Sequence, residues 1–204
     1  MGIQPKTILD IGAYKGLYSK SANVVFPEAV IFAFEPLADC YNELLLLKNS
    51  IKNFECFNIA LSNKKEISVI HRSSFAGSSS LLAMSAVHKS AFPNTAGEVI
   101  ENINTELLDN ILVGKNLTQP ILLKIDVQGY ENFVFEGAKE TLKVCDVIIC
   151  EMSFRELYNG QMLFDKLYSL LTNSGFIFAG SLSELIDPNS SEVLQIDGLF
   201  IKKR

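Results

Sequence analysis

The sequence has little of what marks a metal-binding, membrane-spanning or nucleic-acid-binding protein. None of its four cysteines forms a CxxC pair, so their spacing gives no metal-site pattern. No apolar run approaches the roughly 20 residues that a membrane-spanning helix needs. The formal net charge is −5 at pH 7, whereas nucleic acids and anionic membranes attract basic surfaces. We therefore expect no metal ion, no membrane span and no nucleic-acid partner.

We also expect no secretory leader, because residues 1–6 lead directly into an apolar stretch that is typical of a strand. We interpret the cysteines as reduced, mostly buried thiols, which favours a cytoplasmic protein. A hydrophobic fraction of 48% and a charged fraction of 20% are ordinary for a globular chain. A length of 204 residues most simply makes one domain, 1–204. The oligomeric state has no signature in the sequence.

Short apolar strands alternate with helical patterns along the chain. This alternation predicts an α/β fold, with a mostly parallel sheet and helices on both faces. The last two strands have no helix between them, so we expect an antiparallel pair at the sheet edge. The expected strands are 7–12, 30–34, 54–60, 121–126, 147–151, 175–179 and 197–201.

Helical periodicity is expected at 15–26, 37–51, 132–142 and 160–173. In the first of these helices, the residues expected to face the core are Leu17, Ala22 or Ser21, Val24 and Val25. The second carries four consecutive leucines at 44–47, which we expect to pack on the sheet with little exposed.

The segment 63–104 breaks the alternation. It contains a short strand at 67–70, a Ser- and Gly-rich stretch at 73–81 and another candidate strand at 99–103. We interpret 63–104 as an insertion, or lid, that covers a ligand site within the same domain.

The stretch 7–16 is typical of a strand, a tight turn and a helix start where a ligand approaches the backbone. Gly12 and Gly16 lack the Cβ that would hold a ligand away. Four acids follow strands at corresponding positions, and the carboxyl ends of parallel strands share one edge of a sheet. We therefore expect one crevice to be faced by Asp10, Glu35, Asp126 and Glu151.

Glu35 lies 19 residues after Gly16, where a carboxylate can accept hydrogen bonds from both ribose hydroxyls. An adenosine-containing cofactor is indicated, either NAD or S-adenosyl-L-methionine. The glycine spacing is not G-x-G-x-x-G, and Asp10 would repel a pyrophosphate. The pattern therefore favours a ligand without phosphates.

These residues resemble known motifs. The segment 10–16 resembles the D-[IV]-G-A-N-x-G motif of class I S-adenosylmethionine-dependent methyltransferases, and 124–131 is similar to the K-I-D-V-E-G-x-E signature of the FkbM family. Matching segments at 34–36, 58–62 and 77–81 lie between them in the same order. Two positions depart from the pattern: Tyr14 replaces Asn, and Gln128 replaces Glu.

The resemblance implies a Rossmann-like fold with a seven-stranded sheet, an antiparallel last strand and a three-layer sandwich. It also implies cofactor contacts. The methionine half would be held by Asp10, Gly12 and Gly16, with Ala13 and Tyr14 between the two glycines. The ribose would be held by Glu35 and Pro36, and the adenine end by Asn58 and Ala60. Ser79 would lie over the cofactor carboxylate or at the mouth of the substrate site. Asp126 would lie beside the reacting centre.

Members of this family are associated with O-methylation of sugars and polyketide-like small molecules, so we expect a small-molecule or glycan hydroxyl acceptor. Asp126 and Glu131 are the candidate catalytic bases, with His71 or His88 as weaker alternatives. Glu131 could equally be the acid of a helix first turn. An NAD-dependent oxidoreductase and a non-catalytic S-adenosylmethionine-binding protein remain alternative functions.

Overall fold

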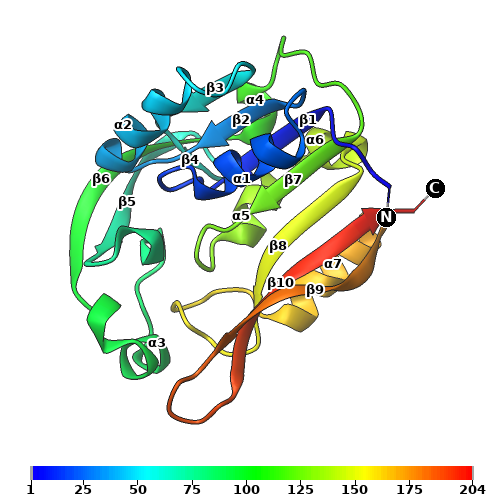
Figure 1. Ribbon diagram of the computed structural model, residues 1–204. Helices are drawn as coiled ribbons and strands as arrows, with labels where there is room; N and C mark the ends of the chain where they lie inside the picture. The colour runs from blue at the N-terminus through cyan, green and yellow to red at the C-terminus, as the bar shows by residue number, and fades with distance from the viewer. Residues whose placement is uncertain (1, 204) are drawn as a thin grey trace.

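The computed structural model describes residues 2–203 and is built on a seven-stranded sheet (Figure 1). The strand order is β3-β2-β1-β7-β8-β10-β9. The five strands from β3 to β8 run parallel, and β10 is antiparallel to both of its neighbours. The strands are β1 (Thr7–Ile11), β2 (Val30–Phe34), β3 (Phe54–Phe57), β7 (Ile121–Ile125), β8 (Val147–Ser153), β9 (Phe176–Ile186) and β10 (Val193–Lys202). The predicted α/β Rossmann-like sheet with an antiparallel last strand is confirmed.

Helices cover both faces of this sheet and complete three layers (Figure 1). Alternate residues of the strands point to opposite faces, so Ile8 packs with one helix layer and Leu9 with the other. One layer comprises α1 (Leu17–Val25) and α2 (Ala38–Leu47). The other comprises α4 (Leu108–Ile111), α5 (Glu131–Glu136), α6 (Lys139–Val144) and α7 (Phe164–Asn173).

Helices α1 and α2 bury fewer apolar side chains than the sequence predicts. In α1 the buried residues are Ser19 and Ala22, whereas Val24 is 80% exposed. Leu17 and Val25 are also exposed, because small side chains at 19 and 22 are the ones that face β1. The leucine run divides in the same way: Leu44 and Leu47 are buried, and Leu45 and Leu46 are exposed. Residues three apart share one face of a helix, so Leu44 and Leu47 face the sheet together while Leu45 and Leu46 point away from it.

The helix predicted at 132–142 is two helices, α5 and α6. They are separated at Gly137, where a Cβ would lie 2.0 Å from the backbone oxygen of Ser62. The chain bends there because the backbone of that turn packs directly against the segment after β4.

A second sheet of three strands lies beside the main one, in the order β4-β6-β5 (Figure 1). It consists of β4 (Ala60–Leu61), β5 (Glu66–Ser73) and β6 (Glu98–Glu106), with η1 (Ala76–Ser78), α3 (Ala86–Ala91) and η2 (Pro93–Thr95) between β5 and β6. The strand predicted at 54–60 is therefore wrong in extent: β3 ends at Phe57, and Ala60 begins a strand of the other sheet.

The four cysteines are buried and free, as expected from their apolar surroundings. Within residues 2–203, no helix combines the length and the apolar character that crossing a membrane requires.

Candidate active site

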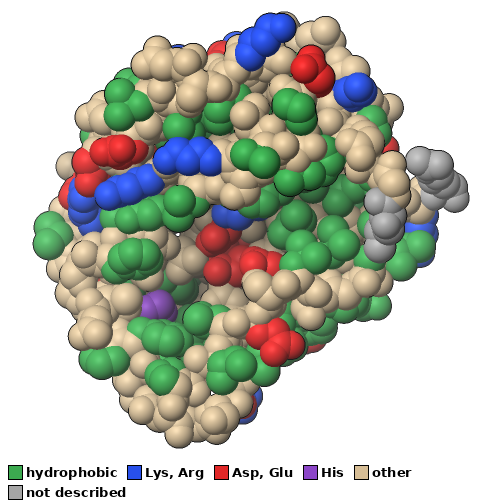
Figure 2. Space-filling model, viewed as in Figure 1, with side chains coloured by type: hydrophobic (Ala, Val, Ile, Leu, Met, Phe, Trp, Pro, Cys, Tyr) green, Lys and Arg blue, Asp and Glu red, His purple; other side chains and the backbone are tan. Residues whose placement is uncertain are grey.

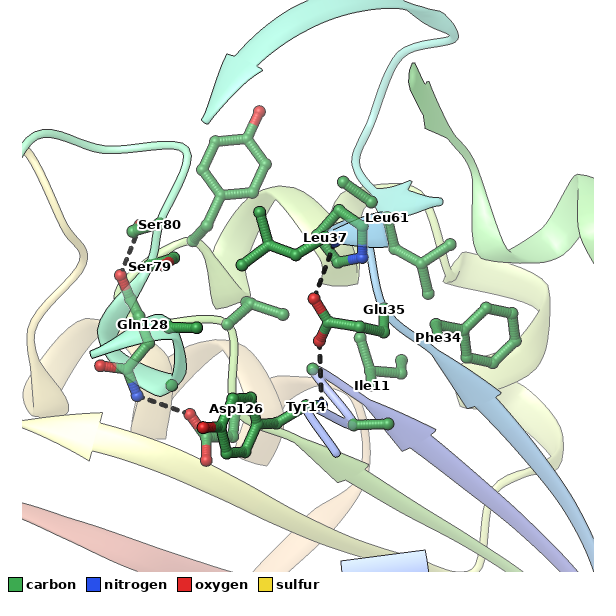
Figure 3. Close-up of a pocket in the computed structure, with 18 of the residues that line it drawn as sticks. Ile11, Tyr14, Phe34, Glu35, Leu37, Leu61, Ser79, Ser80, Asp126 and Gln128 are labelled. Atoms are coloured by element: carbon green, nitrogen blue, oxygen red, sulfur yellow. Dashed lines mark hydrogen bonds between the residues drawn. The ribbon is translucent and has the colours of Figure 1, made fainter. Parts of the chain in front are cut away.

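A pocket of about 360 Å³ lies at the carboxyl ends of β1, β2 and β7 (Figure 3). Its size is within the range of small-molecule sites. The segment 70–81, which includes the end of β5 and η1, forms its far wall. The pocket therefore lies between the two sheets. Of the predicted site residues, those that line it are Gly12, Ala13, Tyr14, Glu35, Pro36, Ala60, Ser79 and Asp126.

The glycines of the first turn make room for protein atoms. Gly12 has φ +74°, and a Cβ there would lie 1.8 Å from the backbone oxygen of Asp126. Gly16 has φ +76°, and its Cβ would lie 2.4 Å from Cδ1 of Leu47. Gly12 still lines the pocket, but Gly16 lies outside the lining and allows α1 to approach α2. We expected the missing Cβ atoms of both glycines to leave room for a ligand. This expectation is wrong, because protein atoms occupy the space beside each glycine.

Asp10 lies behind the pocket wall, with its side chain fully buried. Its Oδ2 accepts a 2.6 Å hydrogen bond from the hydroxyl of Ser19 on α1. Its Oδ1 has no hydrogen-bond partner among residues 2–203. Burial raises the pKa of Asp10.

Glu35 places its carboxylate in the pocket between two backbone amides (Figure 3). Oε2 accepts a hydrogen bond from the Tyr14 N–H, and Oε1 accepts one from the Leu37 N–H, both at 2.9 Å. Burial raises the pKa of Glu35 to about 7, against the opposing effect of these two hydrogen bonds. Asn58 lies outside the lining and donates to the backbone oxygens of Glu35 and Pro36, at 3.0 and 2.8 Å. It fixes the loop that holds the carboxylate.

Apolar side chains form the walls around Glu35. The rings of Tyr14 and Phe75 lie 5.9 Å apart and connect the first turn to the segment after β5. Ser79 also lines the pocket, where its hydroxyl accepts a hydrogen bond from the Ser73 N–H. The apolar walls are formed by Ile11, Phe34, Leu37, Ala60, Leu61, Ile70 and Leu81.

The opposite end of the pocket is charged, and Figure 2 shows acidic side chains at the bottom of a hollow on this face. Asp126 lies there, with Oδ2 3.2 Å from the Lys124 ammonium. Burial lowers the pKa of Lys124, but the carboxylates of Asp126 and Asp10 outweigh this effect and raise that pKa above its ordinary value. Of the four strand-end acids, Glu35 and Asp126 line the pocket, whereas Asp10 and Glu151 are not among the lining residues.

Glu131 is the first residue of α5 and is not among the lining residues. Its buried Oε1 accepts hydrogen bonds from the backbone N–H groups of Val127 and Gly129, both at 3.1 Å. Burial raises the pKa of Glu131 to about 7. The side chain therefore supports the turn after β7, as an acid in a helix first turn can.

The two histidines also lie outside the lining. His88 is buried in α3, and its Nε2 lies 2.9 Å from Oγ1 of Thr95. His71 faces Glu98, with 3.7 Å between Nδ1 and Oε1. This arrangement gives neither histidine a place at the pocket.

Residues 10–178 match the model of the methyltransferase FkbM domain. The chain belongs to the FkbM methyltransferase family. Among curated relatives of this FkbM chain, 2-O-methyltransferase NoeI of Sinorhizobium fredii is 28% identical over 174 residues, which make up 80% of this chain and 70% of that protein.

Solved structures share the fold at low identity. Methyltransferase FkbM from Methylobacillus flagellatus KT has a TM-score of 0.58 at 11% identity, over 97% of this chain and 44% of that one. Precorrin-6y C5,15-methyltransferase from Geobacter metallireducens GS-15 has a TM-score of 0.52 at 11% identity, over 98% of this chain and 82% of that one. The chain thus spans less than half of the first of these proteins.

The sequence pattern assigns no function to one residue that lines the FkbM pocket and to another that contacts a lining residue. Leu37 gives its N–H to Glu35 and lines the pocket, but it follows Pro36 as an ordinary helix-start residue. Tyr158 is buried in the loop after β8, and its hydroxyl donates to the side-chain oxygen of Gln128 at 2.6 Å. Its loop has no periodicity, so only the folded chain brings it here. Lys124, by contrast, lines the pocket and is the first residue of the signature segment 124–131, so the sequence could have identified it as a site residue.

Proposed function

We propose that this FkbM methyltransferase uses S-adenosyl-L-methionine and methylates a hydroxyl oxygen of a small molecule or glycan. The observation that carries this proposal is the Glu35 carboxylate, which lies in a pocket with apolar walls and is held by two backbone amides. A nucleoside needs this combination: flat apolar surfaces for the base and a carboxylate that accepts from both ribose hydroxyls.

The pocket residues fit the parts of such a cofactor. Glu35 would accept from the ribose, and Ala60 with Leu61 would contact the adenine. Asp126 and the turn at 12–14 would hold the methionine end, with Ser79 on the far wall. Asp10 and Gly16 would support this turn from behind rather than contact the ligand. When bound, the cofactor supplies an electrophilic methyl group on a sulfonium sulfur.

Asp126 is the proposed catalytic base, because it is the carboxylate that lines the charged end of the pocket. In a transfer from this cofactor, the electron pair of the carbon–sulfur bond would stay on sulfur. Asp126 would take the proton of the acceptor hydroxyl, which would become strongly acidic as its oxygen bonds to the methyl carbon. Alignment of the oxygen with the methyl group provides much of the acceleration.

The relative NoeI is named a 2-O-methyltransferase. This name supports oxygen as the atom methylated, and a sugar or polyketide-like hydroxyl compound as the acceptor class. A pocket that ends on Lys124 and Asp126 offers polar partners for a hydroxylated acceptor.

Calorimetry with S-adenosylhomocysteine tests the cofactor. We expect the unaltered chain to bind it, and Glu35→Ala to weaken binding by about ten- to a hundredfold, the loss of roughly 1.5–3 kcal/mol for hydrogen bonds to a charged group. Glu43→Ala, which removes an exposed glutamate of α2, is the matched control and should bind normally. Absence of binding by the unaltered chain would refute the proposal, and preferential binding of NADH would favour an oxidoreductase.

A screen of hydroxylated acceptors with labelled S-adenosylmethionine, beginning with glycans, tests the reaction. Cofactor binding without transfer to any hydroxyl compound would favour a non-catalytic binding protein of the same fold.

A further inference from the structure

Gln128 lines the pocket two residues after Asp126 and adopts a strained backbone conformation. Its φ is +56°, in the left-handed region that residues other than glycine rarely occupy. The hydroxyl of Ser80 donates a 2.7 Å hydrogen bond to its backbone oxygen (Figure 3). Strain of this kind persists only where the surroundings hold the residue in place, and it is often functional.

The side-chain amide of Gln128 has a fixed orientation. Its Oε1 accepts the hydroxyl hydrogen of Tyr158 at 2.6 Å. Its Nε2 faces only oxygens that accept: Oδ1 of Asp126 at 2.7 Å, and both carboxylate oxygens of Glu151 at 3.1 and 3.2 Å. Because a carboxylate accepts and an amide nitrogen donates, the nitrogen must lie on this side.

This nitrogen lies where three carboxylate oxygens from two strand ends converge. Burial, followed by the charge of Asp126, raises the pKa of Glu151 well above its ordinary value. An ionised Glu151 would therefore be repelled by Asp126, and the amide hydrogens reduce that repulsion by donating to both carboxylates. Oxygens converging on one centre are also what a magnesium or calcium ion binds.

We propose that Gln128 is a positioning residue of the methyl-transfer site, and that its amide nitrogen occupies the place of a divalent cation between Asp126 and Glu151. Asp126 is then held in its place without a metal ion, with Oδ1 on Gln128 and Oδ2 on Lys124. This proposal rests on the proposed function for the role of Asp126 toward the acceptor.

The K-I-D-V-E-G-x-E signature of the family has glutamate where this chain has Gln128. Replacing Gln128 by glutamate therefore tests the proposal. In residues 2–203, no group of three or more His, Cys, Asp or Glu side chains is placed to hold a metal ion. Gln128→Glu would add a third carboxylate to Asp126 and Glu151 at nearly unchanged side-chain volume. The added charge should destabilise the site until a cation neutralises it.

The experiment measures Mg²⁺ and Mn²⁺ binding by calorimetry, and thermal unfolding with Mg²⁺ or with a chelator. We expect the unaltered chain to unfold at the same temperature in both conditions. For Q128E we expect at least tenfold tighter Mn²⁺ binding than for the unaltered chain, and a higher unfolding temperature with Mg²⁺ than with chelator. Gln119→Glu makes the same chemical change at an exposed site before β7 and should not respond to the ions.

Each outcome bears on the proposal. Specific cation binding by the unaltered chain, or Q128E that binds Mn²⁺ no more tightly, would overturn it. If Q128E is unfolded in chelator, folding on addition of Mg²⁺ supports the proposal, and failure to fold with the ion present counts against it.

Activity gives a further readout once an acceptor is known. Gln128→Met, which removes the amide without adding charge, should lower kcat with or without Mg²⁺, whereas Mg²⁺ should restore kcat in Q128E. A merely structural role would not give this difference. Failure of the proposed function would appear separately, as absence of S-adenosylhomocysteine binding by the unaltered chain, and would leave the cation results intact.

Discussion

The backbone N–H of Tyr14 donates a 2.9 Å hydrogen bond to Oε2 of Glu35, and this bond joins the turn after β1 to the end of β2. The contact uses the backbone of residue 14, so the position of the carboxylate does not depend on the side chain there. Tyr14 nevertheless has φ +50°, a conformation that asparagine adopts more readily than tyrosine. The family motif has asparagine at this position.

Tyr14→Asn should therefore leave S-adenosylhomocysteine affinity within about twofold of the original. Relief of backbone strain stabilises the variant, whereas loss of the contact with Phe75 costs about 0.5–1.5 kcal/mol. We expect these effects to offset each other, so that the free energy of unfolding changes by less than about 1 kcal/mol. Calorimetry and urea denaturation measure both quantities. A tenfold loss of affinity would instead show that the tyrosine ring itself contacts the ligand.

Glu35 should make stability depend on pH. Burial raises its pKa from 4.5 to about 7, so the folded chain keeps this proton at pH values where the unfolded chain has released it. Stability should consequently fall as the pH rises from 4.5 to 7, by up to about 3 kcal/mol, and this contribution should level off above pH 7. Urea denaturation at several pH values measures the slope.

Glu131 and Glu151 also have raised pKa values and contribute to the same slope. The comparison is therefore between the unaltered chain and Glu35→Gln, which cannot titrate at this position. Equal slopes for the two proteins would contradict the assignment to Glu35.

Gly16→Ala should destabilise the fold more than Gly114→Ala. Both glycines have φ +76°, so backbone strain in the alanine variant should lower the free energy of unfolding by about 1 kcal/mol at either position. Only at Gly16 does the new methyl meet other atoms, the buried side chains of Leu47 and Leu44 at 2.4 and 2.9 Å, whereas Gly114 has nothing within 4 Å. Overpacking should cost Gly16→Ala about 1–3 kcal/mol more in urea denaturation. Equal losses would mean that α1 and α2 separate freely.

Glu131 can be tested as a support for the turn after β7. Glu131→Ala leaves the buried N–H groups of Val127 and Gly129 without their acceptor, which should cost about 2–3 kcal/mol of stability. Glu131→Gln keeps an acceptor oxygen and should cost less. With a methylation assay, Glu131→Gln should retain most of the activity. If it folds normally but abolishes transfer, Glu131 is a catalytic base after all.

Much of the fold was predictable because its signals are local. Apolar runs such as 30–34 and 121–125 are long enough to identify strands, and a strand-end acid such as Glu35 follows directly from them. The division between β3 and β4 was not predictable, because the apolar pattern continues through 54–61 and does not record that the chain changes sheets.

The parts of the site that were missed depend on long-range contacts. Tyr158 reaches Gln128 across 30 residues of sequence, and its loop has no repeating pattern. The burial of Asp10 and Glu131 depends on the turns that fold over them, which their sequence positions do not record. The family resemblance therefore placed Asp10 at the ligand, and the role of Glu131 stayed open between a catalytic base and the acid of a helix first turn. The strand-end acids indicated the end of the sheet at which the pocket lies, and only packing separates the residues that line the pocket from those that support it.

Ala60 and Leu61 belong to the pocket wall and also form β4, which pairs with Thr105 and Glu106 of β6. A molecule seated against them contacts the small sheet and the main sheet together, and so acts as a shared core for both. Occupancy of the pocket and the pairing of β4 with β6 should then be thermodynamically coupled. A change that stabilises this pairing should increase the affinity for the ligand, and the ligand should stabilise the pairing by the same free energy.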